Sequence, residues 1–319
     1  EDTETGTNSH IRRLTDEEKS KRNCQYAKWG YLDRGSPEQC KGADKWLVPI
    51  TTNHLSLTIN HLLNMLEKNE MIFGVRAVIE AIQAGREIDK VLVKKDIQSE
   101  LSKELFACLK NTLIPVQRVP VERINRITRK NHQGVVAFIS SVTYQKTEDL
   151  VPFLFEEGKT PLFVMLDGIT DVRNFGAIAR TCECAGADAI IIPSKNSVSV
   201  NADAMKTSAG ALHTLPVCRE QNLTNTIKYL KDCGFKIVAA TEKGDYDYTK
   251  ANYKDPVCII MGAEDTGVPY EHLSLCDEWI KIPLMGKIES LNVSVAAGIL
   301  IYEAVKQRGF TEDKTASAL

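Results

Sequence analysis

Three loops hold most of the residues of this chain that could do chemistry. They follow apolar segments near residues 236–240, 256–261 and 279–282, and they contain Thr241, Glu264 and the pair Ser290 and Asn292. Gly262, in the second loop, would let a ligand approach the backbone closely. Because the carboxyl ends of parallel strands share one edge of a sheet, the three loops predict a ligand site there. The alternative is a set of ordinary strand-to-helix connections.

The loops match no standard nucleotide-binding motif. No G-x-G-x-x-G sequence follows a predicted strand. Gly262 and Gly267 have the interval of a P-loop, but Val268 and Pro269 stand where its Lys and Ser/Thr are needed. A nucleotide-dependent oxidoreductase and an NTPase are therefore both disfavoured.

The elements that must position these loops alternate between strands and helices. The patterns predict strands near 162–166, 189–192, 215–217, 236–240, 256–261 and 279–282, and helices near 174–185, 201–209, 223–233, 269–275 and 291–307. Such alternation predicts an α/β domain with a doubly wound parallel sheet.

A smaller α/β domain precedes this sheet. A turn at 72–74 leads into a helix that ends near residue 84; further helices are expected near 99–110 and 121–129, with strands near 89–94, 115–119 and 134–140. Residues 71–146 carry thirteen Lys and Arg against seven Asp and Glu, whereas the whole chain has a net charge of −2. A basic segment on an acidic remainder is expected if one domain binds a polyanion. A basic surface that is merely solvated is the alternative.

The third helix of the small domain offers candidate contacts to such a polyanion. Arg123, Arg126 and Lys130 are three to four residues apart, and the segment Asn131-His132-Gln133 follows directly. Cations beside a His could bind phosphates and ribose hydroxyls.

Five segments are expected along the chain. Residues 1–64 form an extension of irregular structure whose place in the natural protein the sequence leaves open, and 65–146 form the small domain. Residues 147–160 are a linker, 161–310 form the large α/β domain, and 311–319 are a disordered tail.

Composition excludes several classes of protein. No run of about 18 apolar residues and no signal-peptide pattern occurs, so neither a membrane partner nor secretion is expected. The nine Cys are scattered without a C-x-x-C, so a metal site is not expected either. We therefore predict a cytoplasmic protein with buried, reduced thiols.

Three segments resemble the motifs of a known family. Residues 174–181 (Asn-Phe-Gly-Ala-Ile-Ala-Arg-Thr), 261–268 (Met-Gly-Ala-Glu-Asp-Thr-Gly-Val) and 290–296 (Ser-Leu-Asn-Val-Ser-Val-Ala) resemble, in order, the motifs of the SpoU/TrmH branch of the SPOUT methyltransferases. The small domain is similar to that family's L30e-like substrate-binding domain, from Phe73-Gly74 to the segment 131–137. The resemblance covers about residues 71–310, and residues 1–64 lie outside it.

The resemblance implies both a fold and a reaction. It implies a deep trefoil knot in the large domain, an exception to the rule against threaded chains. It also implies a homodimer that uses S-adenosylmethionine to methylate a ribose 2′-hydroxyl in RNA, with a guanosine of 23S rRNA favoured. The same chemistry on tRNA or on another rRNA site is the alternative. A non-catalytic RNA-binding protein would be expected to have a broken motif, and none of the three is broken.

The resemblance also assigns roles to residues. The expected catalytic and substrate-positioning residues are Asn174, Arg180, Glu264, Ser290 and Asn292. The expected cofactor contacts are Gly262, Ile282 and Leu291, joined by Thr241 and Met285 of the same loops.

Two of these roles have physical alternatives. Arg180 is the family's proposed base, but a guanidinium with a pKa above about 12 accepts protons poorly. A bidentate clamp on a neighbouring phosphate would need no unusual pKa. The structural alternatives are helix-start roles for Asn174 and Asn292 and a loop-bracing role for Glu264.

Overall fold

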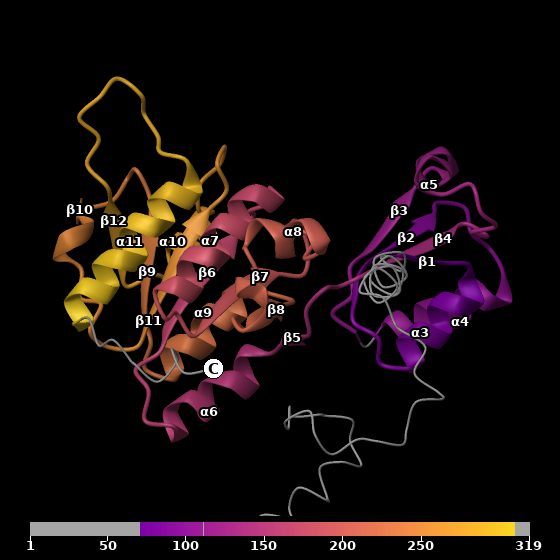
Figure 1. The fold of residues 1–319 in the computed structure, drawn as a ribbon, viewed down its shortest axis with the longest axis horizontal. Coiled ribbons are helices and arrows are strands. Elements are labelled where there is room, and N and C mark those ends of the chain that lie inside the picture. The colour runs from indigo at the N-terminus through magenta and orange to yellow at the C-terminus, as the bar shows by residue number, and fades with distance from the viewer. Residues whose placement is uncertain (1–70, 111, 310–319) are drawn as a thin grey trace, which may run out of the picture. The chain divides into compact units, whose positions relative to one another are not determined.

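A computed structural model of the chain describes residues 71–110 and 112–309 (Figure 1). The expectations for residues 1–64 and for the tail 311–319 lie outside the described residues. Within those ranges, no helix combines the length and the apolar character needed to cross a membrane.

The small domain is built on a mixed four-stranded sheet. Its strands are β1 (Met71–Phe73), β2 (Ile88–Lys94), β3 (Val116–Val119) and β4 (Val135–Ile139), in the order β1-β4-β2-β3. Strands β2 and β3 are parallel, and β4 is antiparallel to both β1 and β2. The helices are α3 (Val75–Gln83), α4 (Glu100–Leu109) and α5 (Val121–Ile127). The prediction of a small α/β domain is confirmed, whereas β1 occupies residues that were expected to form a turn.

The large domain contains an eight-stranded sheet in which every pairing is parallel. The strands are β5 (Tyr144–Gln145), β6 (Leu162–Asp167), β7 (Ala189–Pro193), β8 (Val217–Glu220), β9 (Lys236–Ala240), β10 (Tyr246–Asp247), β11 (Val257–Gly262) and β12 (Glu278–Lys281). Their order is β10-β12-β9-β11-β6-β7-β8-β5. The predicted parallel sheet is confirmed, and the expectation that its chain is knotted stays a prediction.

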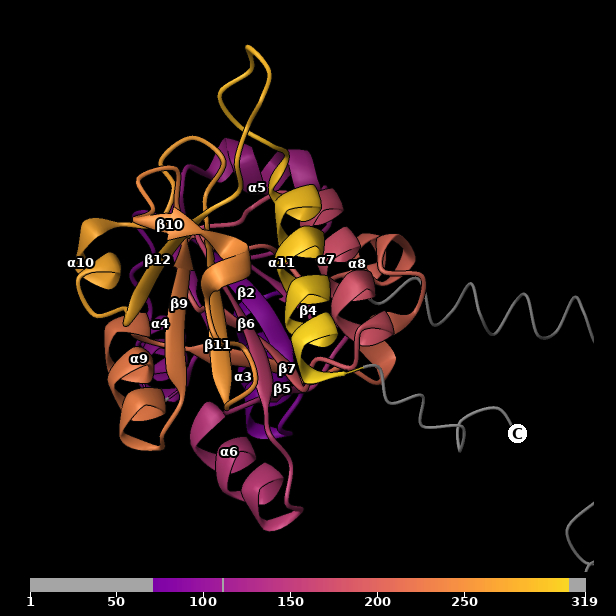
Figure 2. The same ribbon diagram turned by 90° about the vertical axis from the view of Figure 1, so that its left-hand side faces the viewer.

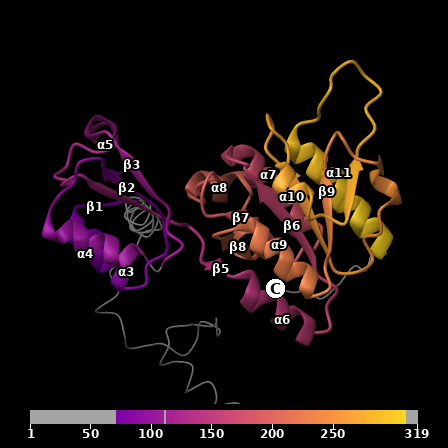
Figure 3. The ribbon, with the colours of Figure 1, turned by 180° about the vertical axis from the view of Figure 1, so that it is seen from behind.

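Helices cover both faces of this sheet (Figures 2 and 3). They are α6 (Thr147–Glu156), α7 (Val172–Cys184), α8 (Ala202–Thr207), α9 (Leu223–Asp232), α10 (Tyr270–Leu273) and α11 (Val293–Arg308), with short 3-10 turns at Ala211–His213 and Tyr248–Lys250. Alternate residues of a strand point to opposite faces. Val164 and Leu166 of β6 accordingly pack in the core with α7, α8 and α11, whereas Phe163 and Met165 pack with α6, α9 and α10.

The predicted linker is part of the large domain. Tyr144 and Gln145, which were expected at the end of the small domain, pair with β8, and α6 lies within the predicted linker 147–160. Leu150 and Leu154 of α6 are buried in one of the two cores of the large sheet. A two-residue strand has no hydrophobic period of its own, so its membership of the sheet depends on a partner more than 70 residues away.

The described cysteines lie in both domains. All seven described cysteines are free, and Cys182, Cys218 and Cys258 are buried. Burial raises the pKa of the Cys182 and Cys258 thiols far above the ordinary value, because a thiolate would lose its hydration. These thiols are small apolar core residues.

The order of the strands brings the chemistry-bearing loops together. Strands β12, β9, β11 and β6 are consecutive neighbours. The three loops that follow β9, β11 and β12 therefore meet at one edge, beside the turn that leads from β6 into α7.

Two glycines in helices allow a matched test of this packing. A Cβ at Gly176 of α7 would lie 2.5 Å from the Cβ of Thr207 on α8, whereas a Cβ at Gly298 of α11 would have its nearest neighbour at 3.9 Å. We expect Gly176→Ala to lower the free energy of unfolding by about 1–3 kcal/mol through overpacking. Gly298→Ala should leave stability unchanged or raise it by up to about 1 kcal/mol, because alanine favours helix. Urea denaturation measures both, and equal effects of the two variants would contradict the close contact between α7 and α8.

Candidate functional site

A cavity of about 550 Å³ opens at the carboxyl ends of β9, β11 and β12. Its inner wall is apolar and includes Leu273, Ile280, Val293, Ala296 and Leu300. Its rim is polar and includes the side chains of Thr241, Glu242, Lys243, Glu264, Glu289 and Ser290. An apolar wall with a few polar groups at the mouth suits a small ligand that has a flat apolar part and charged ends.

Gly262 lets the loop after β11 fold back on its own strand. A Cβ at this position would lie 2.1 Å from the carbonyl carbon of Gly267 and 2.2 Å from the nitrogen of Val268. The amide of Gly267 donates to the carbonyl of Ala263 at 2.8 Å, and Gly267 itself has a φ of +67°. The tight turn therefore requires glycine at both positions, and it places Glu264 on the cavity rim.

Three of the predicted catalytic residues form one hydrogen-bonded chain. The side-chain amide of Asn292 donates to the Oδ1 of Asn174 at 3.1 Å, and the amide of Asn174 donates to the Glu264 carboxylate. The Oδ1 of Asn292 accepts from the backbone and hydroxyl of Ser294, at the start of α11. Asn292 must therefore point its NH₂ group at Asn174, whose own NH₂ group then faces Glu264. The chain of amides presents Glu264 as a hydrogen-bond acceptor.

The backbone explains why these side chains meet. Asp171 caps α7 by accepting from the amide of Arg173 at 2.7 Å, so Asn174 lies in the first turn of the helix and is buried. Asn292 caps α11 in the same manner. Asn292 therefore has the helix-start role considered for it, and it also donates to Asn174.

Arg180 lies apart from this chain of side chains. It is exposed, and it makes no hydrogen bond or ion pair with another residue in the described part of the chain. It follows Asn174 by six residues, which is about 9 Å along a helix and about 120° around it. Ser290 is also exposed, but it lines the cavity.

The residues expected to contact a cofactor fall into two groups. Thr241, Gly262, Ile282 and Leu291 all line the cavity. Met285 does not line it, and 96% of its surface is exposed. Residues 283–290 extend from β12 without regular structure, so neighbouring side chains of this loop differ in their surroundings.

The basic residues of the small domain also differ in their surroundings. Arg123 and Arg126 are exposed on α5. Lys130 lies beyond the end of that helix, with its Nζ 5.2 Å from the centroid of the Phe73 ring. His132 accepts from the amide of Gly134 through Nδ1 and contacts Asn125 Oδ1 through Nε2 at 2.8 Å. Both nitrogens of that ring are therefore used within the domain, with the proton on Nε2.

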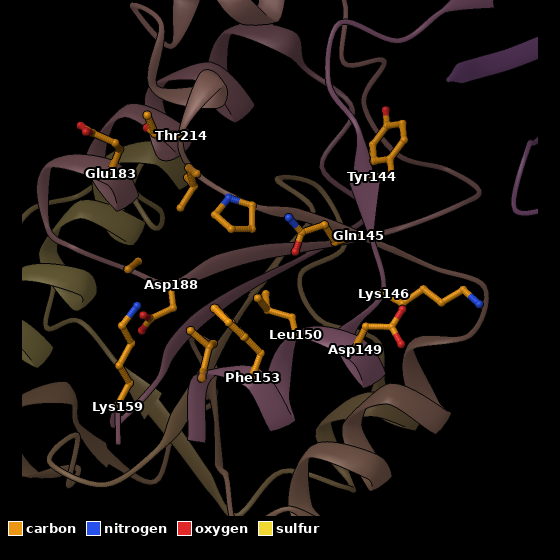
Figure 4. Close-up of a pocket in the computed structure, with 14 residues that line it drawn as sticks. Tyr144, Gln145, Lys146, Asp149, Leu150, Phe153, Lys159, Glu183, Asp188 and Thr214 are labelled. Atoms are coloured by element: carbon orange, nitrogen blue, oxygen red, sulfur yellow. The ribbon is translucent and has the colours of Figure 1, made fainter. Parts of the chain in front are cut away.

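A second, larger cavity lies at the opposite edge of the sheet. Its volume is about 840 Å³, and it opens near the amino ends of β6, β7 and β8. Figure 4 shows Leu150 and Phe153 of α6 in its wall, with Lys159 and Asp188 close to each other at one side. None of the predicted catalytic or cofactor-contacting residues lines it. Volume alone would make this cavity the candidate site, but the predicted catalytic residues Glu264 and Ser290 line the smaller cavity.

Two features complete the description of the site. Within residues 71–110 and 112–309, no group of three or more His, Cys, Asp or Glu side chains could hold a metal ion. Asp167 and His272 form a close pair at the end of β6 that the sequence analysis missed. The only signal was a carboxylate at the end of an apolar strand, and nothing pointed to His272.

Two family models match the two described domains. Residues 161–302 match the SpoU rRNA Methylase family, and residues 71–145 match the family described as RNA 2′-O ribose methyltransferase substrate binding. A Staphylococcus saprophyticus protein assigned to the TrmH family of tRNA/rRNA methyltransferases is 36% identical over 244 residues, which are 76% of this chain and 98% of the relative. The Bacillus subtilis relative YacO, with the same assignment, is 31% identical over the same shares of both chains.

Among solved structures, the chain is similar to an AdoMet-bound rRNA methyltransferase from Sinorhizobium meliloti. The two are 27% identical, with a TM-score of 0.48, over 81% of this chain and 97% of the other. The two family matches cover both described domains in the expected order, and the bacterial relatives match over nearly their whole length. The chain therefore belongs to the SpoU/TrmH family of RNA 2′-O-ribose methyltransferases and carries that family's substrate-binding domain.

Proposed function

We propose that this protein transfers a methyl group from S-adenosylmethionine to a ribose 2′-hydroxyl of RNA. The observation that carries the proposal is the chain from Asn292 through Asn174 to Glu264, because it brings together one residue from each of the three family motifs at the mouth of an apolar cavity. Such an arrangement can bind a small cofactor and orient a hydroxyl group beside it.

The cavity fits S-adenosylmethionine in its chemistry. The apolar wall formed by Leu291, Val293 and Ala296 suits the adenine ring, and the close backbone approach at Gly262 leaves room beside it. The rim groups Thr241 and Ser290 can bind the ribose and amino acid parts. When bound, this cofactor supplies an electrophilic methyl group on a sulfonium.

The residues of the chain then position the nucleophile. In-line displacement at a methyl group depends chiefly on the distance and angle of the attacking oxygen. The Glu264 carboxylate, oriented by Asn174, can accept a hydrogen bond from the 2′-hydroxyl, hold that oxygen in place and take up its proton as the methyl group is transferred. Arg180 lies free of Glu264 and is exposed, which suits a clamp on a neighbouring RNA phosphate. Exposed Arg123 and Arg126 of the small domain suit further phosphate contacts.

For the substrate we propose a guanosine of 23S rRNA, with tRNA or another rRNA site as the second candidate. The support is the resemblance of the small domain to the family's L30e-like substrate-binding domain. The names of the bacterial relatives include both tRNA and rRNA, so the test must separate them.

The test is methyl transfer from labelled S-adenosylmethionine to total RNA of a cell that lacks this protein. We expect one ribose-methylated nucleotide in large-subunit rRNA, located by primer extension. Label in tRNA would support the same methyl transfer but show that tRNA is the substrate.

Arg180→Ala should lower methyl transfer to RNA by more than about 100-fold while the affinity for the cofactor stays unchanged, because the substitution removes a charge at the RNA and not in the cavity. Arg173→Ala, also exposed on α7, is the matched control.

Cofactor binding can be tested separately from transfer. Leu291 lines the cavity and Met285 of the same loop does not. Leu291→Arg should weaken S-adenosylmethionine binding at least about tenfold, because it places a charge against an apolar wall. Met285→Arg should leave the dissociation constant unchanged. Calorimetry measures both, and equal effects would place the cofactor elsewhere.

We also propose that the protein is a homodimer through the outer face of α11. Val295 and Tyr302 lie seven residues apart on this helix, and 52% and 46% of their surfaces are exposed. Two exposed apolar side chains two turns apart form a stripe on one helix face that a second copy of the chain can cover.

Sedimentation should therefore give twice the chain mass of 35.5 kDa. Tyr302→Glu should produce monomers because it places a charge within the stripe, whereas Lys306→Gln on the same helix should not. A monomeric wild-type protein would refute the proposal.

A further inference from the structure

His272 and Asp167 form a close, largely buried pair beside the site. The Nδ1 of His272 lies 2.6 Å from the Oδ2 of Asp167, and their side chains are 14% and 11% exposed. Asp167 is the last residue of β6, and His272 belongs to α10, more than 100 residues later. A contact so short and so well shielded restricts the movement of both segments.

The pair holds together the two ends of the segment that carries Glu264. Asp167 is aligned with Gly262 where β6 and β11 end side by side. From Gly262 the chain leaves the sheet, turns back at Gly267, and buries Val268 in the core with α10. It then returns to the end of β6 through His272. The contact with Asp167 therefore completes a closed loop of about ten residues.

The same two segments are joined a second time at the site itself. There the amide of Asn174, from the segment after β6, donates to Glu264, from the segment after β11. Between the two joints, a Cβ at Gly168 would lie 3.3 Å from the Cβ of Ala263, so the backbones are in close contact. Displacing one joint must shift the other, because the loop between them is short and packed.

We propose that Asp167 and His272 are a positioning pair for methyl transfer. The pair holds the segment 263–271 against the end of β6, so that Glu264 keeps its contact with Asn174 at the cavity rim. His272 acts through Glu264 and does not itself line the cavity. This inference rests on the proposed methyltransferase function and assigns a role within it.

The first test compares substitutions that keep or remove one hydrogen bond. The side-chain amide of asparagine can replace Nδ1 of histidine, whereas leucine offers no donor. We expect His272→Leu to lower kcat about 10- to 100-fold with KM for S-adenosylmethionine changed less than about threefold, because the orientation of the hydroxyl is lost and the cavity wall remains. His272→Asn should recover most of kcat. Glu271→Gln, in the neighbouring residue of α10, should leave kcat unchanged.

The second test separates positioning from general stability. In a Glu264→Gln background, His272→Leu should lower kcat by less than about twofold further, because the group it positions has already been altered. A loss as large as in the wild-type background would show that His272 does not act through Glu264. Wild-type kcat in His272→Leu, or no recovery in His272→Asn, would also overturn the proposal.

A variant that does not fold and an incorrect proposed function can both be distinguished from the outcomes above. If His272→Leu does not fold, Asp167→Leu and Asp167→Asn are compared instead. Asparagine keeps an acceptor oxygen for His272, whereas leucine does not. Asp167→Leu should then lower kcat and Asp167→Asn should largely preserve it, and equal activities would refute the pair. A wild-type protein that binds S-adenosylmethionine but methylates no RNA would instead refute the proposed function.

Discussion

The contact of a loop with its own strand at Gly262 is the constraint on which the rest of the site depends. Any side chain at this position would overlap the backbone of Gly267 and Val268. With glycine there, the loop after β11 turns back toward its own strand, and Glu264 contacts Asn174. The same fold-back opens the cavity wall beneath it, since Gly262 lines that wall. One steric requirement therefore shapes both the binding cavity and the polar chain.

The polar chain has a direction that the two helix starts impose. Asn292 gives its oxygen to the amino end of α11, so that its NH₂ group faces Asn174. Each amide in the chain can satisfy its neighbour in one orientation only, and the series ends at a carboxylate. Neutral amides do not cancel the charge of Glu264, which is exposed at the rim. A negatively charged acceptor held by uncharged donors is suited to orienting a hydroxyl group without a competing cation.

The parallel sheet supplies rigid support for this arrangement. Strands β6 and β11 are buried along their lengths, and their residues alternate between two cores. Because α7 and α11 lie on one face and α10 on the other, the end of β6 is held from both sides. Asn174 contacts Glu264 on the side of α7, and His272 contacts Asp167 on the side of α10. Movement of the loop between them is therefore opposed on both faces of the sheet.

Local periodicity in the sequence was sufficient to predict most of the elements. The strand from 236 to 240 and the helices around α7, α9 and α11 form nearly where their apolar spacing places them, because each segment carries the full apolar period of its own element. Strands β1, β5 and β10 have two or three residues each, and no local pattern distinguishes them from turns. Their pairing was decided by partners that are distant in the sequence.

The same division holds for the site. The three motifs already identified Asn174, Glu264 and Asn292 as candidates, because their types and their loops are visible in the sequence. Only the tertiary structure showed that these side chains form one chain, that Arg180 stands apart and that Met285 does not line the cavity. His272 had no signal at all, since its role arises from a carboxylate 105 residues earlier. Residue types and spacing determine which groups are present, and packing decides which of them meet.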